Sequence, residues 1–568
     1  MEGLLRALIF AGIGVAMYFV FNGDPSAEIS RQPIFKTFHE VAGKGTPETS
    51  CTLWTPEFRA TFASRGAGIT SYRLLTAKYQ HDDEGLDLAT TPDLELDRSL
   101  RFHFRNPAVA APGKQEWNAN FDLVNWTLVR SEAKLCEFHY QDEKVELAKT
   151  LRTTEQPYEI EVTASIKNLA DKTLPHALSV STAAWRYQHE VEGKFGRISP
   201  YITSVECIPV TGDEERKLPD EFEPDDFADD QLFRHSALHR GDWMQPQGEP
   251  AFTAVTNAYF AQALVPLKSA KAPVCQLQID ERIDPRSNAN SGSIYRARLA
   301  YPERDLKPGE STEYSVLSFI GPKERLVLAS AGKGEHQLDK LIDLGFFTAI
   351  AKVLVNFLLT VYGLFPNWGV AIIVLTVTAR FLLFPLSLPS IKNMIRMREL
   401  KPDMDALNEK FKDDPQQKGL AQMELWKKEG VNPFKGCLPQ LASMPVWFAL
   451  YRTLQSAVEL YNIPFLWFPD LSEPDPYFVL PLIIGVVFFL QQKLMPMQGG
   501  DPMQQKMMMY FMPGMFTVFM LFLPAGLGVY MFTNSLLAIT QQQVVEWHTK
   551  RSTGLNRDGS TGSKKAES

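Results

Sequence analysis

Arg380 is a charged residue inside an apolar run that extends from Gly369 to Pro389. A guanidinium stays protonated in proteins, and an arginine at the centre of a membrane helix costs about 2.5–3.5 kcal/mol on insertion scales. Thr376 precedes it by about one helical turn, so the two polar side chains share one stripe of a helix. A charge at such a depth marks function by default. We therefore predict a polar functional site around Arg380.

A structural arginine paired with a carboxylate of another span is the alternative. The spans offer few partners, because Glu459 and Glu546 lie at the ends of apolar segments. We therefore expect an unpaired Arg380 that faces a water-filled cavity.

The elements that must position Arg380 follow from the distribution of apolar residues. The chain has 568 residues, 45% of them hydrophobic, and a formal net charge of −8, which is too weak a balance to suggest a specific nucleic-acid partner. Apolar runs dominate residues 346–545, whereas the middle of the chain is mixed and polar. The fold class that we predict is an α-helical polytopic membrane protein of six spans with a large all-β exported sandwich domain.

The N-terminal stretch from Leu4 to Phe21 is an apolar segment that directs export of the domain after it. Its length and the absence of a small-residue cleavage site favour an uncleaved anchor over a signal peptide. We predict an anchor over residues 1–21, a polar linker over 22–44 and the exported domain over 45–325.

Period-two patterning predicts the β structure of this domain. Between Glu159 and Lys167, apolar and polar residues alternate, as in a strand with one buried face. Similar runs recur between clusters of turn residues, without a convincing amphipathic helix, which favours a large β-sandwich.

Four cysteines lie in the exported domain and allow three pairings, among which the sequence does not choose. Their irregular spacing in a domain with a large core favours unpaired buried thiols over a disulfide framework. These residues are Cys51, Cys136, Cys207 and Cys275. We find no catalytic motif, cofactor motif or metal-ligand spacing.

The membrane half begins with a segment whose polar residues recur every fourth position. Residues 326–365 are predicted to be a linker followed by an amphipathic helix in the membrane interface, although a full span has a permitted length. Five spans follow within 366–545: about Gly369–Pro389, Leu438–Leu460, Tyr477–Gln492, and two within Met507–Val545 divided at Pro524.

The loop charges give an orientation. Residues 391–435 carry ten basic residues, the tail 546–568 carries five, and residues 460–476 carry none. The positive-inside rule places the first two segments and both termini in the cytoplasm, and the β domain outside.

Within 391–435, apolar residues from Met397 to Phe411 follow a 3-4-3-4 spacing. Asp413, Asp414 and Pro415 interrupt it, and Leu420 opens a second helical pattern. We predict a cytoplasmic helical hairpin.

Several blocks together resemble the YidC family of membrane protein insertases, in the form with a large periplasmic domain that bacteria with an outer membrane carry. Those of the membrane half are NWG at Asn367–Gly369, the mid-span Arg380, and the stretches Asn432–Leu460, Asp501–Pro513 and Phe522–Gln543. The exported domain matches more loosely, at Ser64–Leu74 and Ser318–Lys323.

The resemblance implies a bacterial inner-membrane insertase and chaperone, which is not an enzyme and needs no cofactor. It acts alone or with the Sec translocon, and its groove is open to the cytoplasm and lipid but closed outside. Nascent membrane proteins, the lipid bilayer, and a ribosome or targeting receptor at the hairpin and tail are the implied partners. The expected groove residues are Arg380, Thr376, Gln440, Ser443, Tyr530 and Asn534.

The chain departs from the family pattern at two positions. Ser443 stands where relatives often carry Gln, and Met531 stands where many carry a second Tyr. Two other function classes remain open: a transporter or channel that binds an anionic solute at Arg380, and an anchored, exported sugar-active enzyme. A transporter would show an inverted repeat, and an enzyme would show a paired acid and base; we see neither.

Overall fold

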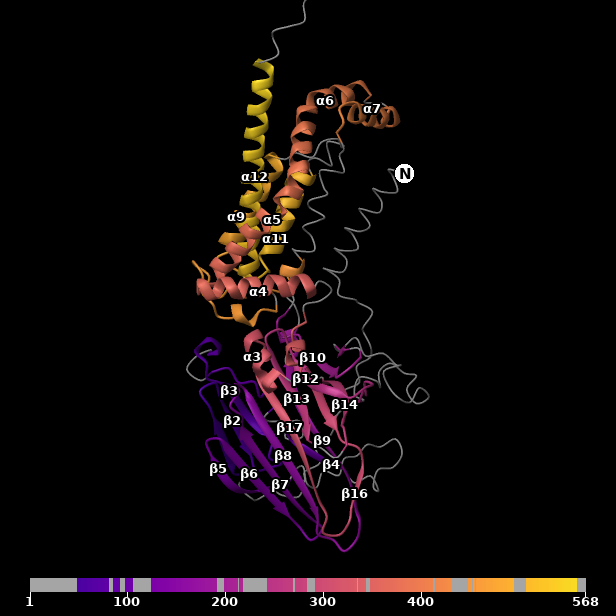
Figure 1. The fold of residues 1–568 in the computed structure, drawn as a ribbon, viewed down its shortest axis with the longest axis vertical. Helices are drawn as coiled ribbons and strands as arrows, with labels where there is room; N and C mark the ends of the chain where they lie inside the picture. The colour runs from indigo at the N-terminus through magenta and orange to yellow at the C-terminus, as the bar shows by residue number, and fades with distance from the viewer. Residues whose placement is uncertain are drawn as a thin grey trace, which may run out of the picture. The chain divides into compact units, whose positions relative to one another are not determined.

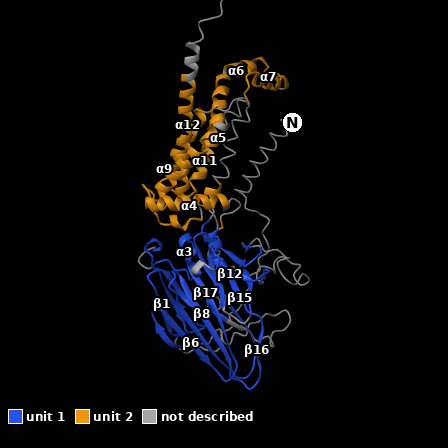
Figure 2. Cartoon of the chain, viewed as in Figure 1, with its two compact units in different colours: residues 1–342 blue, residues 343–568 orange. Residues whose placement is uncertain are grey.

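The structure is a computed structural model of the full chain. It describes residues 48–558 except 81–84, 92–97, 106–123, 192–198, 213, 218–242, 269–270, 283–291, 335, 344–347, 412–413, 432–447, 452, 455 and 495–506. The chain divides into two compact units between Ile342 and Asp343 (Figure 2). The predicted anchor over residues 1–21 and the linker over 22–44 lie outside the described residues.

Unit 1 is built from antiparallel β-sheets, as the period-two patterning predicts (Figure 1). The largest sheet has nine strands in the order β11-β10-β12-β13-β17-β8-β7-β6-β5. Their bounds are β5 Thr127–Glu132, β6 Leu135–Gln141, β7 Val145–Thr153, β8 Glu159–Asn168, β10 Ser204–Pro209, β11 Glu215–Lys217, β12 Pro250–Thr256, β13 Phe260–Lys268 and β17 Ser311–Pro322.

A second sheet has five strands in the order β14-β15-β9-β16, with β4 paired to β9, and a third has the order β1-β2-β3. The bounds are β1 Ser50–Trp54, β2 Phe58–Ala63, β3 Ile69–Leu74, β4 Phe102–Arg105, β9 Leu174–Tyr187, β14 Val274–Arg282, β15 Gly292–Ala300 and β16 Arg304–Leu306. The short helices of this part are η2 Ala77–Tyr79 and α2 Gln188–Val191.

The core of unit 1 lies between the two larger sheets. Val205 and Val255 of the nine-stranded sheet are buried in one cluster with Leu277 and Ala297 of the five-stranded sheet. Two sheets that share one apolar core form a sandwich. The alternation predicted for β8 is confirmed, since its apolar residues from Ile160 to Ile166 are at most 2% exposed.

The cysteine prediction was wrong, because disulfides join Cys51 to Cys136 and Cys207 to Cys275. The sequence separations are 85 and 68 residues, and the Cα atoms lie 6.0 and 6.1 Å apart. Each disulfide joins strands of two different sheets, β1 to β6 and β10 to β14, so the packing of the sheets brings these distant residues to the separation that a disulfide needs. The spacing of the cysteines along the chain does not show which strands lie close together in space. The sequence therefore led us to predict unpaired thiols.

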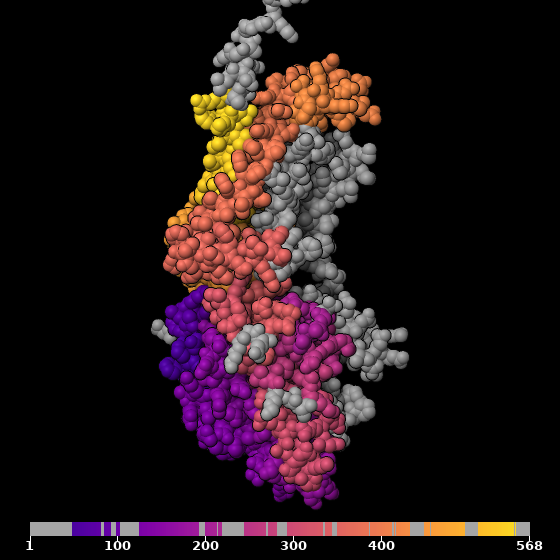
Figure 3. Space-filling model, in the orientation of Figure 1, coloured from indigo at the N-terminus to yellow at the C-terminus, as the bar shows by residue number. Residues whose placement is uncertain are grey.

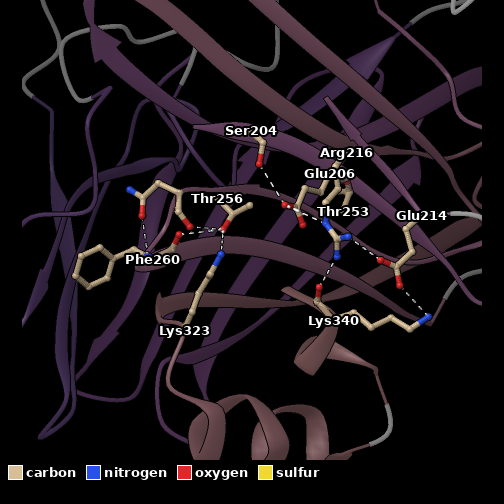
Figure 4. Close-up of polar contacts among 10 residues, drawn as sticks. Ser204, Glu206, Glu214, Arg216, Thr253, Thr256, Phe260, Lys323 and Lys340 are labelled. Carbon is tan, nitrogen blue, oxygen red and sulfur yellow. Dashed lines mark hydrogen bonds and ion pairs between the residues drawn. The ribbon is translucent and has the colours of Figure 1, made fainter. Parts of the chain in front are cut away.

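Unit 1 ends in three short helices: α3 Arg325–Ser330, η9 Ala331–Gly334 and η10 Leu338–Leu341. A network of ion pairs links η10 to β11, the strand at the edge of the nine-stranded sheet (Figure 4). Arg216 contacts Glu214 at 2.8 Å and Glu206 at 3.5 Å, and donates a hydrogen bond to the carbonyl of Lys340. Glu206 is 3% exposed, and this burial raises the pKa of its carboxyl despite the neighbouring Arg216.

Unit 2 is helical. Its helices are α4 Thr348–Leu364, α5 Trp368–Glu399, α6 Lys401–Lys410, α7 Pro415–Lys428, η11 Val458–Leu460, α9 Val479–Leu494, the π-turn η12 Met507–Phe511, α11 Met512–Met520 and α12 Ala525–Asp558. Helix α5 packs along α12, α12 packs against α9, and α9 packs against α11 (Figure 1). The predicted division at Pro524 is confirmed, because α11 ends before it and α12 begins after it.

Among the described residues, one helical stretch is long and apolar enough to cross a membrane by itself, Trp368–Pro385, with a mean hydropathy of 1.9. Three shorter apolar helices accompany it: Ala349–Leu364, Val479–Leu494 and Met509–Met520. The six-span count therefore stays a prediction.

Helix α4 lies across the end of the helical unit where α12 begins and forms a broad band of its surface (Figures 1 and 3). One face is buried, with Ala351, Leu358 and Val361 at 6% exposure or less, whereas Lys352 and Asn356 are exposed. This is the amphipathic pattern that the polar spacing predicts for an interfacial helix.

The segment predicted as a hairpin differs in its boundaries. Helix α5 continues through Pro385 and Pro389 to Glu399, and α6 and α7 follow. Asp414 caps α7 by accepting hydrogen bonds from two backbone N–H groups. On α7, Leu420 is 59% exposed, so this part of the predicted apolar face is open to the surroundings.

Candidate functional site

Arg380 of α5 contacts Asn534 of α12. The Arg380 Nε donates a hydrogen bond of 2.6 Å to the Asn534 Oδ1. The arginine is therefore hydrogen-bonded to an amide, and the water-filled cavity expected beside it stays a prediction. Within the described part of the chain, no carboxylate lies within ion-pair distance of Arg380, so the partner is a neutral amide and the positive charge is not neutralised. A charge held in this way attracts anionic or polar groups most strongly where water is scarce.

The start of α5 is fixed by the NWG motif. The Asn367 side chain accepts a 3.0 Å hydrogen bond from the Val370 N–H, which satisfies one of the free donors at the helix end. Trp368 stacks on Tyr362 of α4, with ring centroids 4.4 Å apart. A Cβ atom at position 369 would lie 2.2 Å from the Phe465 ring, so only glycine permits this contact. These contacts set where α5 begins and therefore which way Arg380 points.

Helix α12 brings two further polar residues to Arg380. Tyr530, one turn before Asn534 and 7% exposed, lies near the guanidinium. Gln541, two turns after Asn534, donates a 3.4 Å hydrogen bond to the Arg380 carbonyl. The sequence-based selection missed Gln541, although its spacing of seven residues from Asn534 places it on the same helix face.

The other expected groove residues are less clearly placed. Thr376 is fully buried, and its hydroxyl donates a 2.7 Å hydrogen bond to the Ile372 carbonyl of its own helix. Its polar group is therefore already satisfied. Gln440 and Ser443 lie outside the described residues. Met531, which replaces a family tyrosine, is 7% exposed.

The end of the bundle where α12 begins is covered by residues 456–477. Leu471 and Phe468 of this segment are at most 1% exposed. The Leu471 carbonyl accepts a hydrogen bond of 2.9 Å from the Gly526 N–H at the start of α12. Asp475 accepts hydrogen bonds from the Tyr477 and Leu480 N–H groups at the start of α9. The segment is thus hydrogen-bonded to the ends of two helices.

Large apolar side chains next to Arg380 point away from the protein. Phe381 and Leu382 are 77% and 72% exposed, and Leu482 and Val486 of α9 are each 60% exposed. Helices with apolar outer faces and a charged inner contact suit a lipid solvent. Among the described residues, no group of three His, Cys, Asp or Glu side chains could hold a metal ion.

Comparison with known proteins matches both units of the chain to one family. The model of the 60 kDa inner membrane protein family matches residues 360–552, and that of the YidC periplasmic domain matches residues 50–357. A membrane protein insertase YidC of Anaeromyxobacter sp. strain K is 33% identical over 517 residues, which cover 88% of this chain and 86% of that protein.

Two more matches differ in identity and in the share of the chain that they cover. The YidC insertase of Paraburkholderia phymatum is 42% identical over 295 residues, which cover 52% of this chain and 51% of that protein. A crystal structure of an active YidC insertase with its first transmembrane domain resolved covers 94% of this chain and 99% of that chain, at 17% identity and a TM-score of 0.37.

Proposed function

Since this chain belongs to the YidC family of membrane protein insertases, we propose that it performs insertion through a polar groove centred on Arg380 and Asn534. The protein inserts newly made proteins into the inner membrane, and it carries a β-rich periplasmic domain and a helical membrane core. Membership of the YidC family favours the insertase function over that of a transporter or channel for anionic solutes and over that of an anchored sugar-active enzyme.

The contact between Arg380 and Asn534 carries the proposal. Both side chains come from the interior of long helices with apolar outer faces, and the amide leaves the charge of Arg380 available. A hydrophilic segment of a substrate would otherwise have to cross the full hydrocarbon layer unaided, where each unsatisfied backbone group costs several kcal/mol. A polar groove shortens that path, and Arg380 offers hydrogen-bond donors to the segment at mid-path.

The remaining groove residues complete this proposal. Tyr530 would border the groove beside the guanidinium, and Thr376, Gln440 and Ser443 would extend its wall. The packed segment 456–477 supports closure on the outer side, since it is tied to the starts of α9 and α12. Substrate burial in lipid would drive insertion, and the membrane potential would add about 2.3 kcal/mol per charge per 100 mV for acidic segments.

We further propose six spans with both termini in the cytoplasm, following the loop charges. Helix α4 would lie in the outer interface with Lys352 toward water. We keep the predicted segments 45–325, 326–365, 366–545 and 546–568 as a proposal, which the break between the two compact units at residues 342–343, inside the segment 326–365, supports. The Sec translocon, and a ribosome or targeting receptor at α6 and α7, are proposed partners.

Substitution of Arg380 tests the groove. We expect Arg380→Lys to retain partial insertion of a single-span substrate with an acidic exported tail, because the charge remains while the planar donors are lost. Arg380→Glu should abolish insertion, because it repels the acidic segment. Protease protection of the newly made substrate in depleted cells gives the readout.

The matched control is Lys352→Glu, a charge reversal of the same sign change on the exposed face of α4. It should insert the substrate far better than Arg380→Glu at equal protein level. Wild-type insertion by the Arg380→Glu variant would exclude the proposed groove centre.

A further inference from the structure

Helix α5 has a weak point between its membrane half and its cytoplasmic extension. Pro385 and Pro389 lie inside the helix, and neither can donate the backbone hydrogen bond that its position requires. Between them, the Ser387 hydroxyl donates a 2.8 Å hydrogen bond to the Leu383 carbonyl, a back-bond that often accompanies helix bending. Residues 385–389 are therefore the most easily bent part of α5.

Beyond this point, polar contacts hold the end of α5 to two other helices. Arg398 forms an ion pair with Glu546 of α12 and donates a 3.4 Å hydrogen bond to the carbonyl of Leu494, the last residue of α9. Gln542 of α12 donates a 3.2 Å hydrogen bond to the same carbonyl. Three helices thus meet at one carbonyl oxygen.

A small apolar contact lies between the prolines and this junction. Ile391 and Ile395 of α5 are buried with Val545 of α12, and Phe384 and Leu388 pack against them. The Arg398 side chain is 32% exposed, whereas the Glu546 side chain is 10% exposed, so only one end of the ion pair is open to water. The junction is therefore held by a few polar contacts, and its opening would expose the Glu546 carboxylate to water.

We propose that residues 385–389 form a hinge and that Arg398, Glu546 and Gln542 form a clasp, whose release separates the end of α5 from α12. The separation would widen the mouth through which a substrate segment reaches Arg380. This inference rests on the proposed groove, and it assigns to Arg398 and Glu546 a positioning role in the insertion cycle.

Reversible crosslinking in the full-length protein tests the clasp. Cysteines replace Arg398 and Glu546 in a Cys437→Ala background, and a bismaleimide with a cleavable disulfide links them in inverted membrane vesicles. We expect insertion to fall at least fivefold when the link is complete, and to recover when a membrane-impermeant phosphine cleaves it. A linked protein that inserts substrate at the unlinked rate would overturn the proposal.

Two controls distinguish an effect of holding α5 against α12 from a non-specific effect of the reagent or the substitutions. Cysteines at Lys392 and Arg396, both exposed on α5, accept the same reagent without joining two helices, and insertion should be unchanged. The exchanged pair Arg398→Glu with Glu546→Arg should insert better than either single variant, whereas equal loss in all three would contradict a clasp. Cysteine at both positions removes the clasp side chains, so linked protein is compared with unlinked protein of the same sequence. Insertion by the unlinked protein above the level of Arg380→Glu shows that the groove functions, so a failure of the clasp is distinguishable from a failure of the groove.

Discussion

At the scale of single residues, the chemistry of Arg380 depends on what accompanies it. A carboxylate partner would make a neutral structural pair, whereas Asn534 orients the guanidinium and leaves its charge intact. The type and depth of Arg380 were readable from the sequence, because one arginine in a long apolar run has few explanations. Its partner was not, since the pairing of α5 with α12 is a tertiary contact between residues 154 positions apart.

The β domain contains a buried lysine on the apolar face of strand β7, where period-two alternation places it with Val145, Leu147 and Leu151. Lys149 is 1% exposed and donates hydrogen bonds to the carbonyls of Ala67 and Leu100, the latter at 2.6 Å. Burial, and secondarily the nearby Arg101, lower the pKa of Lys149 well below its usual value. Lysine is rarely fully buried unless its ammonium group has partners. The sequence does not reveal these partners, because both carbonyls belong to distant segments of the chain.

His176 makes the stability of the β domain depend on pH. Its Nε2 lies 2.8 Å from the Tyr314 hydroxyl, and burial, followed by the charge of Arg304, lowers the pKa of His176 from 6.5 to about 4. The backbone of Arg304 and the carboxylates of Asp305 and Glu310 oppose this shift. Below pH 6.5 the unfolded chain binds a proton that the folded domain refuses, so the free energy of unfolding should fall by up to about 3 kcal/mol between pH 6.5 and 4.

His176→Gln should remove this part of the pH dependence, because the amide keeps a hydrogen-bonding group near Tyr314 and does not titrate. Urea unfolding of the full-length protein at several pH values, read by pulsed hydrogen exchange in β9 and β17, measures it. His139→Gln is the control, since the His139 side chain is 40% exposed. An unchanged slope in His176→Gln would assign the pH dependence to other groups.

At the scale of elements, helix periodicity predicted two helices within residues 391–435 but not their burial. Met404 of α6 is 3% exposed and Met423 of α7 is 55% exposed, although both belong to predicted apolar faces. The spacing of apolar residues indicates a shared face, whereas the neighbours of that face are set by tertiary packing. The same limit explains why α5 extends ten residues past the predicted span end at Pro389, to Glu399.

The two methionines provide a matched test of this segment. Met404→Ser should lower hydrogen-exchange protection throughout α6 and α7, because replacing a buried methionine with a small side chain costs about 2–5 kcal/mol. Met423→Ser should leave protection unchanged, because little buried surface is lost. If the exposed face of α7 binds a partner, as we propose, Met423→Ser should still reduce insertion. Equal protection in both variants would show that Met404 does not hold the segment together.

At the scale of the whole molecule, we propose that the two units act separately. Unit 1 folds around its own sandwich core and is closed by two disulfides. The residues that we place in the groove all come after position 365, and their described contacts lie within unit 2. The charge pattern and the apolar runs predicted this division from the sequence, because export and membrane insertion each impose a distinct composition.

Removal of the β-sandwich domain tests whether unit 2 inserts substrates without it. A chain that lacks residues 45–320 keeps the N-terminal anchor and all groove residues, so it should insert single-span substrates at a rate within about threefold of the full chain. The comparison requires depleted cells, equal protein levels and protease protection of newly made substrate. Arg380→Glu in the shortened chain is the matched control and should abolish insertion again. If the shortened chain fails for every substrate while it remains in the membrane, the periplasmic domain takes part in insertion itself, and the groove alone is insufficient.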